Sequence, residues 1–361
     1  MKYLAVLGRQ PEISIAELTA LFSDVKKFNK SLATFIAESV DINRLGGSIQ
    51  IAEELSEKPL EILQKVPDGK ITIGVSDYSK NASTRSAKTE ALKLKQILVR
   101  HGRSVRVVES REATLPTATS LHNGLSGKNE HKFEFIKVDN SWYRVVGVQD
   151  IDAYTKRDQA RPARDAKVGM LPPKLAQILI NLCGPLPAGS RILDPFCGTG
   201  VVLQEALLMG YSAYGTDLSE RMVEYTEKNL KFFDFTDYKV EAGDATSHKW
   251  GKKIDAVACE GYLGVPMSTP PAEIKLKEQK QECSSIVLGF LKNLASQIDS
   301  DTPVVIAVPA WLRSDGIYSR LEIVDEIANM GYNVMNKSRE GLLYHREDQI
   351  VARDIIILWK K

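Results

Sequence analysis

The C-terminal half of the chain alternates between short apolar runs and segments in which apolar residues have helical spacing. Residues 304–309 are apolar throughout, which is typical of a strand covered on both faces of a sheet. Other runs predict strands at 190–193, 212–217, 240–245, 254–259, 332–335 and 355–359. Apolar residues that recur every three or four positions predict helices at 201–209, 273–298 and 317–330. This alternation predicts an α/β fold with a doubly wound parallel sheet, which binds ligands at the carboxyl ends of its strands.

The first 150 residues carry a different, α+β pattern. Strand-like runs lie at 2–8, 33–40, 70–76 and 105–108, and helical spacing is found at 14–22, 59–65 and 82–101. Residues 132–138 and 142–148 predict a hairpin across Asp139-Asn140-Ser141. We therefore predict one α+β unit at 1–52, a second at 53–150, a charged connector at 151–168 and the α/β domain at 169–361.

The amino-acid composition indicates the broad class of protein. The chain has 361 residues, 43% of them apolar and 26% charged, which is ordinary for a soluble globular protein of two or three domains. It has no apolar stretch long enough to span a bilayer, and a strand-like run follows Met1 directly, so we expect no membrane partner and no signal peptide. The four cysteines lie far apart without a CxxC pair, and no histidine pair has the spacing of metal ligands. We therefore expect a cytoplasmic protein with no metal site.

Charge is uneven along the chain although the net charge is only +2. Between residues 79 and 111 there are nine basic residues and only two acids, Glu90 and Glu109. The plain interpretation is a solvated helix face. The functional one is a surface that binds a phosphate backbone. The predicted RNA-binding residues are four from this segment and two arginines from the connector: Lys80, Arg85, Lys88, Arg106, Arg161 and Arg164.

Residues 194–200 form a glycine-rich turn between an expected strand and an expected helix. Gly198 and Gly200 let the backbone approach a ligand closely, and the helix that follows directs its free N–H groups toward that ligand. Asp194 at the strand end argues against a pyrophosphate, because the two anions would repel each other. A cationic ligand such as S-adenosylmethionine (SAM) fits this acid better.

Two further acids follow in the order that a SAM site requires. Asp217 ends the second expected strand, where a carboxylate would bind ribose hydroxyls, and Asp244 ends the third, where it would meet the adenine amino group. One acid after a strand is usually a turn or helix-cap residue, but three in this order favour a cofactor site. The predicted cofactor-binding residues are Asp194, Pro195, Phe196, Cys197, Gly198, Thr199, Gly200, Asp217, Leu218, Asp244 and Ala245.

The end of the fourth expected strand is where a substrate base would meet the cofactor. There the chain reads Glu260-Gly261-Tyr262, and we take these as the candidate catalytic residues. Glu260 would accept hydrogen bonds from an exocyclic amine and so aim its lone pair at the methyl group, while Tyr262 would stack on the base. The structural alternative makes Glu260 a surface turn acid and Tyr262 a core aromatic. Cys197 and Cys259 fall nearby, but neither has a base close in sequence that would activate a thiol.

Together these segments resemble the tRNA guanosine N2-methyltransferases that act at position 10, enzymes with an RNA-binding THUMP domain and a Rossmann-like SAM domain. Besides the glycine turn and the residues just after it, the resemblance is carried by residues 7–18, 161–165, 169–176 and 178–182. It implies an N-terminal ferredoxin-like unit at 1–52, a THUMP domain at 53–150 that docks the tRNA acceptor end, a linker at 151–168 and the Rossmann-like methyltransferase domain at 169–361. It also implies that Asp194, Gly198 and Gly200 hold the methionine part of SAM.

The resemblance implies SAM-dependent methylation of the N2 amine of a guanosine in tRNA. It also implies a small zinc-binding activator subunit as a candidate partner, because some relatives of the family require one. The chain departs from the family after the fourth strand, where Asp/Asn-Pro-Pro-aromatic is usual. Either Glu260 replaces the acid in a loop one residue shorter, or Tyr262 matches the aromatic and Cys259 replaces the acid.

Two other functions remain as alternatives to the tRNA enzyme. The altered loop would suit an RNA-binding protein that has lost catalysis, and the SAM site would also suit a methyltransferase of another nucleic-acid amine, such as adenine N6 in DNA. The basic segment before the catalytic domain argues for RNA. A dehydrogenase is disfavoured, because Asp194 would oppose a pyrophosphate.

Overall fold

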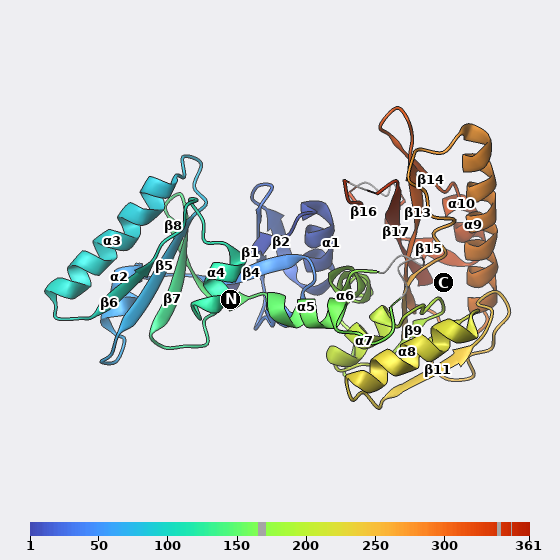
Figure 1. Ribbon diagram of the computed structural model, residues 1–361, viewed down its shortest axis with the longest axis horizontal. Coiled ribbons are helices and arrows are strands. Elements are labelled where there is room, and N and C mark those ends of the chain that lie inside the picture. The colour runs from blue at the N-terminus through green and yellow to red at the C-terminus, as the bar shows by residue number, and fades with distance from the viewer. Residues whose placement is uncertain (165–170, 338–340, 348) are drawn as a thin grey trace. The chain divides into compact units, whose positions relative to one another are not determined.

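The computed structural model describes residues 1–164, 171–337, 341–347 and 349–361 (Figure 1). The chain divides into two compact units, Met1–Ala153 and Tyr154–Lys361. The predicted end of the linker at 168 and the predicted start of the catalytic domain at 169 lie outside the described residues.

The first unit is built on one continuous sheet with strand order β2-β3-β1-β4-β8-β7-β5-β6. Its strands are β1 (Lys2–Leu7), β2 (Ser23–Lys27), β3 (Leu32–Ile36), β4 (Ser48–Glu54), β5 (Ile71–Asp77), β6 (Val105–Val108), β7 (Lys132–Val138) and β8 (Ser141–Val148). The pairings are antiparallel except for β5, which runs parallel to both β6 and β7. The helical elements are α1 (Pro11–Leu21), the 3-10 turn η1 (Ile42–Arg44), α2 (Pro59–Gln64), α3 (Thr84–Arg100) and α4 (Thr117–His122).

The β4–β8 pairing joins the halves that we predicted as separate units at 1–52 and 53–150. The expected hairpin is confirmed as β7 and β8, with Asp139 in the left-handed region at φ +51° in the turn. The sequence pattern missed β2, whose residues are largely exposed and therefore carry no apolar run. The boundary at 52 and the THUMP assignment stay predictions.

The second unit carries the predicted doubly wound sheet, with strand order β11-β10-β9-β12-β13-β17-β15. Its strands are β9 (Arg191–Asp194), β10 (Ser212–Asp217), β11 (Tyr238–Ala242), β12 (Ala256–Glu260), β13 (Pro303–Leu312), β14 (Tyr318–Arg320), β15 (Tyr332–Val334), β16 (Leu343–Tyr344) and β17 (Val351–Lys360). Strands β9 to β13 pair in parallel, while β17 lies antiparallel between β13 and β15. The expected α/β class is therefore confirmed.

The helices of this unit are α5 (Ile151–Gln159), which begins at the unit boundary, α6 (Pro173–Asn181), α7 (Val201–Leu208), α8 (Glu220–Phe232), α9 (Glu273–Leu294) and α10 (Val324–Asn329). The largest apolar core packs α9 and α10 against the central strands (Figure 1), with Phe290, Trp311 and Ile356 fully buried.

Three predicted elements differ from the structure. The helix predicted at 317–330 is a short strand, β14, followed by α10, because residues 318–320 pair with the end of β13. The connector at 151–168 begins as the helix α5. The strand predicted at 240–245 ends at Ala242, so Asp244 lies in the loop beyond β11 and does not end a strand.

Candidate functional site

The glycine-rich turn leads from the end of β9 into α7 at the carboxyl edge of the parallel strands. Gly198 has φ +50° and Gly200 has φ +83°, a region that residues with a Cβ rarely adopt. A Cβ on Gly200 would lie 2.8 Å from Cγ2 of Thr226, so this glycine is also required by packing. The N–H of Gly198 donates to Oδ2 of Asp217 at 2.9 Å, which ties the turn to the neighbouring strand β10.

Asp194 is the buried acid at the start of this turn. Its side chain is 2% exposed, and its Oδ1 accepts a hydrogen bond from the N–H of Phe196 at 3.1 Å. Burial raises the pKa of Asp194 well above its usual range, and the nearby charges of Asp217 and Glu260 raise it further. Among the described residues, no Lys or Arg pairs with it. Within the described part of the chain, the turn therefore holds a buried acid without a cationic partner.

Arg161 and Asn229 hold the glycine turn through Thr199. Nη1 of Arg161 donates to Oγ1 of Thr199 at 3.1 Å, and Nδ2 of Asn229 in α8 donates to the carbonyl oxygen of Thr199 at 2.8 Å. Asn229 also exchanges hydrogen bonds with the backbone of Ala163, which anchors the residues after Arg161. Sequence reasoning missed Asn229, because an asparagine inside a helix gives no signal of its tertiary partners.

Arg161 therefore has a different place from the one we expected. It is 3% exposed and contacts the glycine turn, so it does not present its charge to a solvent-borne RNA. Arg164 is exposed and stays in the predicted RNA-binding set.

The other predicted cofactor residues lie along the same edge of the sheet. Asp217 accepts the N–H of Ser219 at 2.9 Å through its other oxygen, and Leu218 beside it is 78% exposed, which is unusual for a leucine. Asp244 accepts from the N–H and the hydroxyl of Thr246 at 2.8 and 2.7 Å, and these hydrogen bonds lower its pKa. Ala245 is 5% exposed beside it.

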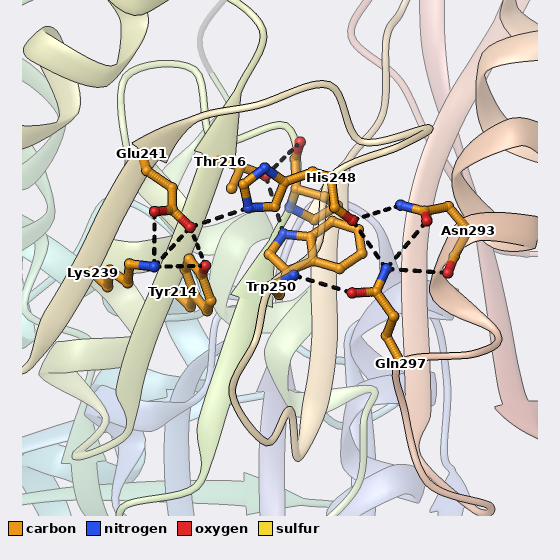
Figure 2. A network of polar contacts seen from close by, with 9 residues as sticks. Tyr214, Thr216, Lys239, Glu241, His248, Trp250, Asn293 and Gln297 are labelled. Carbon is orange, nitrogen blue, oxygen red and sulfur yellow. Dashed lines mark hydrogen bonds and ion pairs between the residues drawn. The ribbon is translucent and has the colours of Figure 1, made fainter.

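A polar network that the sequence did not reveal holds the loop carrying Asp244 (Figure 2). Nε2 of His248 lies 3.1 Å from Oε1 of Glu241 at the end of β11, and Nε1 of Trp250 donates to Oγ1 of Thr216 in β10 at 3.3 Å. From α9, Asn293 donates to the carbonyl oxygens of Ala245 and His248 at 3.0 and 2.9 Å. The loop is thus fixed to two strands and to α9.

Glu260, the last residue of β12, forms a buried ion pair with Arg353 of β17. Nε of Arg353 donates to Oε1 of Glu260 at 2.5 Å, and the two side chains are 6% and 15% exposed. Burial raises the pKa of Glu260, although Arg353 acts in the opposite direction. The second oxygen of Glu260, Oε2, has no hydrogen-bond partner among the described residues.

Of the two alignments that the sequence left open, the geometry supports Glu260 as the acid. Cys259 is fully buried in the core, and burial raises the pKa of its thiol well above the usual range. The thiol of Cys197 is shifted the same way for the same reason, so neither cysteine offers a thiolate. Gly261 continues the β12–β13 pairing, because its N–H donates to the carbonyl oxygen of Ala307 at 2.9 Å.

Tyr262 is partly buried and packs against the core beside α9. Burial raises the pKa of its hydroxyl, with smaller contributions from Glu282 and Cys283 of that helix. The ring of Tyr262 therefore packs partly against the core and stays partly exposed in the loop after β12.

The predicted RNA-binding residues of the first unit lie at the surface. Lys80 and Arg85 are exposed. Lys88 pairs with Glu109 at 2.7 Å, and Nη2 of Arg106 donates to Oδ1 of Asn123 at 3.0 Å, so part of their charge is compensated. Their contact with RNA stays a prediction.

The described residues show neither a metal-binding cluster nor a membrane-spanning helix. They contain no group of three or more His, Cys, Asp or Glu side chains arranged to hold a metal ion. Within the same residues, no helix has both the length and the apolar character needed to cross a bilayer.

Comparison with known families gives a direct match for the second unit. Residues 161–285 match the UPF0020 family, described as RMKL-like, methyltransferase domain. This range contains the glycine turn, both later acids and Glu260. The second unit therefore matches a methyltransferase domain over these residues, and the predicted bounds of 169–361 stay a prediction.

Curated relatives give a consistent picture. The chain is 36% identical over 157 residues to a tRNA (guanine(10)-N2)-dimethyltransferase of Methanothermobacter thermautotrophicus, covering 43% of this chain and 44% of that protein. It is 38% identical over 134 residues to the enzyme of the same name from Pyrococcus abyssi, covering 36% of this chain and 40% of that protein. A third, from Methanocaldococcus jannaschii, is 25% identical over 72% of this chain and 81% of its own length. The chain thus matches less than half the length of the first two relatives. The similarity to tRNA (guanine(10)-N2) methyltransferases is confirmed, and the THUMP assignment stays a prediction.

Proposed function

We propose that this protein transfers a methyl group from SAM to the exocyclic N2 amine of a guanosine in tRNA, at position 10 as in the names of its relatives. The methyltransferase domain supports the reaction class. The relatives support the substrate, and the site at the carboxyl edge of the sheet supplies the groups that the reaction needs.

One observation carries the proposal for the cofactor. Asp194 is a buried carboxylate beside a glycine turn, close to Asp217 and Glu260, and without a basic partner among the described residues. Such a group is costly to bury as an anion unless a cation meets it. SAM carries an ammonium group and a positive sulfonium, so the residues present fit it, whereas a dinucleotide pyrophosphate would add a further anion.

The roles of the cofactor-binding residues follow from their positions. Asp194 and the glycine turn would hold the amino-acid end of SAM, Asp217 the ribose hydroxyls, and the loop from Asp244 to Ala245 the adenine. Exposed Leu218 would cover one face of the adenine ring. When bound, SAM supplies an electrophilic methyl group at the sulfonium.

Glu260 is the proposed catalytic acceptor. Oε1 is held by Arg353, and Oε2 is left to accept an N–H from the substrate amine and to take the proton that the amine releases. A guanine presents N1–H and N2–H donors on one edge, both of which suit a carboxylate, while adenine places the acceptor N1 beside its amine. Glu260 therefore favours guanine over adenine, and Tyr262 would support the base from the side of α9.

The first unit would bind the tRNA. Lys80, Arg85, Lys88 and Arg106 lie on its surface, and we assign residues 53–150 to a THUMP domain that docks the acceptor end. We place the protein in the cytoplasm, since its four cysteines are buried and free. A small activator subunit remains a candidate partner.

The proposal is tested by incubating the full chain with tritiated SAM and unmodified tRNA, followed by nucleoside analysis. Label in N2-methylguanosine or its dimethyl form is expected, and Glu260→Gln should lower the rate by about 100-fold or more while SAM binding persists. Label in methyladenosine, or equal transfer to DNA, would overturn the proposed substrate. SAM binding without any transfer would favour the RNA-binding alternative.

A further inference from the structure

The loop that presents Glu260 contains no residue type that would restrict its backbone strongly. Residues 260–265 contain Gly261 and Gly264 and no proline, so the unfolded segment has a wide choice of backbone conformations. A catalytic carboxylate must nevertheless be held to a fraction of an ångström. The restraint has to come from elsewhere in the chain.

Arg353 restrains the first end of the loop. It lies in β17, paired with Pro309 of β13 on one side and with Tyr344 of β16 on the other, so the strand pairing fixes its backbone. Its Nε donates to Oε1 of Glu260 at 2.5 Å, and Nη1 donates to Oε1 of Gln349 at 3.3 Å. The guanidinium is planar and directional, so it fixes the orientation of the carboxylate as well as its charge.

Gln279 restrains the other end of the loop. It is a polar residue of α9 that is only 4% exposed, and its Oε1 accepts the N–H of Val265 at 2.8 Å. Its Nε2 donates to Oε2 of Glu282 at 2.9 Å, which sets the orientation of the amide. Gly264 sits against it with φ +79°, and a Cβ there would lie 2.5 Å from Oε1 of Gln279. A buried amide in this position has no evident role other than to hold the loop.

We propose that Arg353 and Gln279 are positioning residues that clamp the loop 260–265 at its two ends and thereby aim Oε2 of Glu260 at the substrate amine. This inference rests on the proposed function. Neither residue is expected to contact the substrate or SAM. Both act through the loop. Arg353 comes from a strand 93 residues after Glu260, and Gln279 comes from the helix that follows the loop, 14 residues after Val265.

The charges around Glu260 make the role of Arg353 measurable. Asp194 at the end of β9 repels the ionised form, Cys259 precedes it in β12, and Arg353 in β17 is the cation that favours ionisation. Without the guanidinium of Arg353, Glu260 is a buried acid beside Asp194, and its ionised form is disfavoured. The catalytic form of Glu260 would then require a higher pH.

The first experiment compares Arg353→Met, Arg353→Lys and the wild type, with Arg313→Met as the matched control. Arg313 lies in the turn between β13 and β14. Its side chain is half exposed and, among the described residues, forms an ion pair with Asp315 at 2.8 Å. Arg353→Met should reduce kcat/KM for tRNA by about 100-fold, leave the Kd for SAM within about twofold, and move the acid limb of the pH–rate profile to higher pH. Arg353→Lys should restore the position of the acid limb but only part of the rate, because a lysine keeps the charge and loses the planar geometry.

The second experiment compares Gln279→Leu with Gln281→Leu, an exposed residue of the same helix. Gln279→Leu should lower kcat by about tenfold with an unchanged pH profile and an unchanged Kd for SAM, while Gln281→Leu should resemble the wild type. Amide hydrogen exchange of the peptide that contains Val265 should become faster in Gln279→Leu and stay slow in the control.

The exchange measurement separates the two proposals. If the wild type transfers no methyl group to tRNA, the proposed function fails, but slow exchange that is lost in Gln279→Leu would still support the clamp. If exchange at Val265 is the same in all variants, or if Arg353→Met leaves the acid limb unmoved, the clamp is wrong whatever the wild type methylates.

Discussion

Two loops lie at the carboxyl ends of strands in the same sheet, and they are held in different ways. The glycine turn at 194–200 depends on the left-handed backbone of Gly198 and Gly200, and a neighbouring strand and helix then hold it through Asp217 of β10 and Thr226 of α8. The acceptor loop at 260–265 is fixed by Arg353, 93 residues away, and by Gln279 of α9. The first kind of restraint leaves a motif in the sequence, and the second leaves none.

The comparison suggests a division of labour. We expect the glycine geometry of the turn to govern cofactor binding, and the contacts of Arg353 and Gln279 to govern alignment of the substrate amine. Changes at the turn should therefore affect SAM affinity and folding, and changes at the clamp should affect turnover with SAM affinity kept.

Gly200→Ala should have the largest effect. The substitution places a Cβ 2.8 Å from Thr226 at φ +83°, so we expect strain and overlap together to cost about 2–4 kcal/mol in the free energy of unfolding. Gly184→Ala is the control, because its φ of +86° is similar and its Cβ would meet nothing within 4 Å. Urea denaturation of both variants checks this. Equal losses would mean that packing against Thr226 is unimportant.

Asp194→Asn should reduce SAM affinity by about 100-fold, since the cation loses its buried counter-charge. The same variant should be more stable than the wild type at neutral pH. The folded-state pKa of Asp194 is raised, so its contribution to stability is present at low pH and is lost as pH rises through that pKa. Calorimetric titration with SAM and thermal unfolding at two pH values test both statements. A variant that is less stable at neutral pH would contradict the buried, unpaired acid.

Glu205 in α7, behind the turn, should make stability depend on pH near neutrality. Burial raises its pKa to about 7, partly offset by Arg157 at 3.2 Å. The raised pKa means that stability falls as pH rises from about 4.5 through 7, by about 1–3 kcal/mol. Glu205→Gln should flatten this part of the profile, as followed by urea denaturation between pH 5 and 8. An unchanged slope would assign the dependence to other groups.

Arg161→Met and Arg164→Met should have the smallest effects, and they should differ in whether SAM binding or tRNA binding changes. Arg161 supports Thr199, so its loss should weaken SAM binding by about tenfold. Arg164 is exposed, so its loss should leave SAM binding unchanged and reduce the salt dependence of tRNA binding by about one phosphate contact. If Arg161→Met instead weakens tRNA binding and leaves SAM affinity intact, Arg161 is an RNA-binding residue, as the sequence predicted.

Much of the fold was predictable from local patterns. The apolar run at 304–309 was recognised as a buried strand, and the structure places it in the middle of the sheet as part of β13. The turn residues Asp139 and Gly200 signalled a hairpin and a ligand loop. The helix predicted at 317–330 was wrong, because its first residues find strand partners on β13 that no local pattern indicates.

The candidate site divides along the same line. By itself, the sequence determined the strand–turn–helix motif with Asp194, the acids Asp217 and Asp244, and the candidate acid Glu260, because glycine geometry and strand ends are local properties. Only the tertiary structure decided that Arg161 supports the turn, that Cys259 is closed in the core, and that Glu260 meets Arg353. The physical reason is that an ion pair depends on how the strands are ordered in the sheet. Strands β12 and β17 lie on either side of β13, and this order brings Glu260 within reach of Arg353 although 93 residues separate them in the chain.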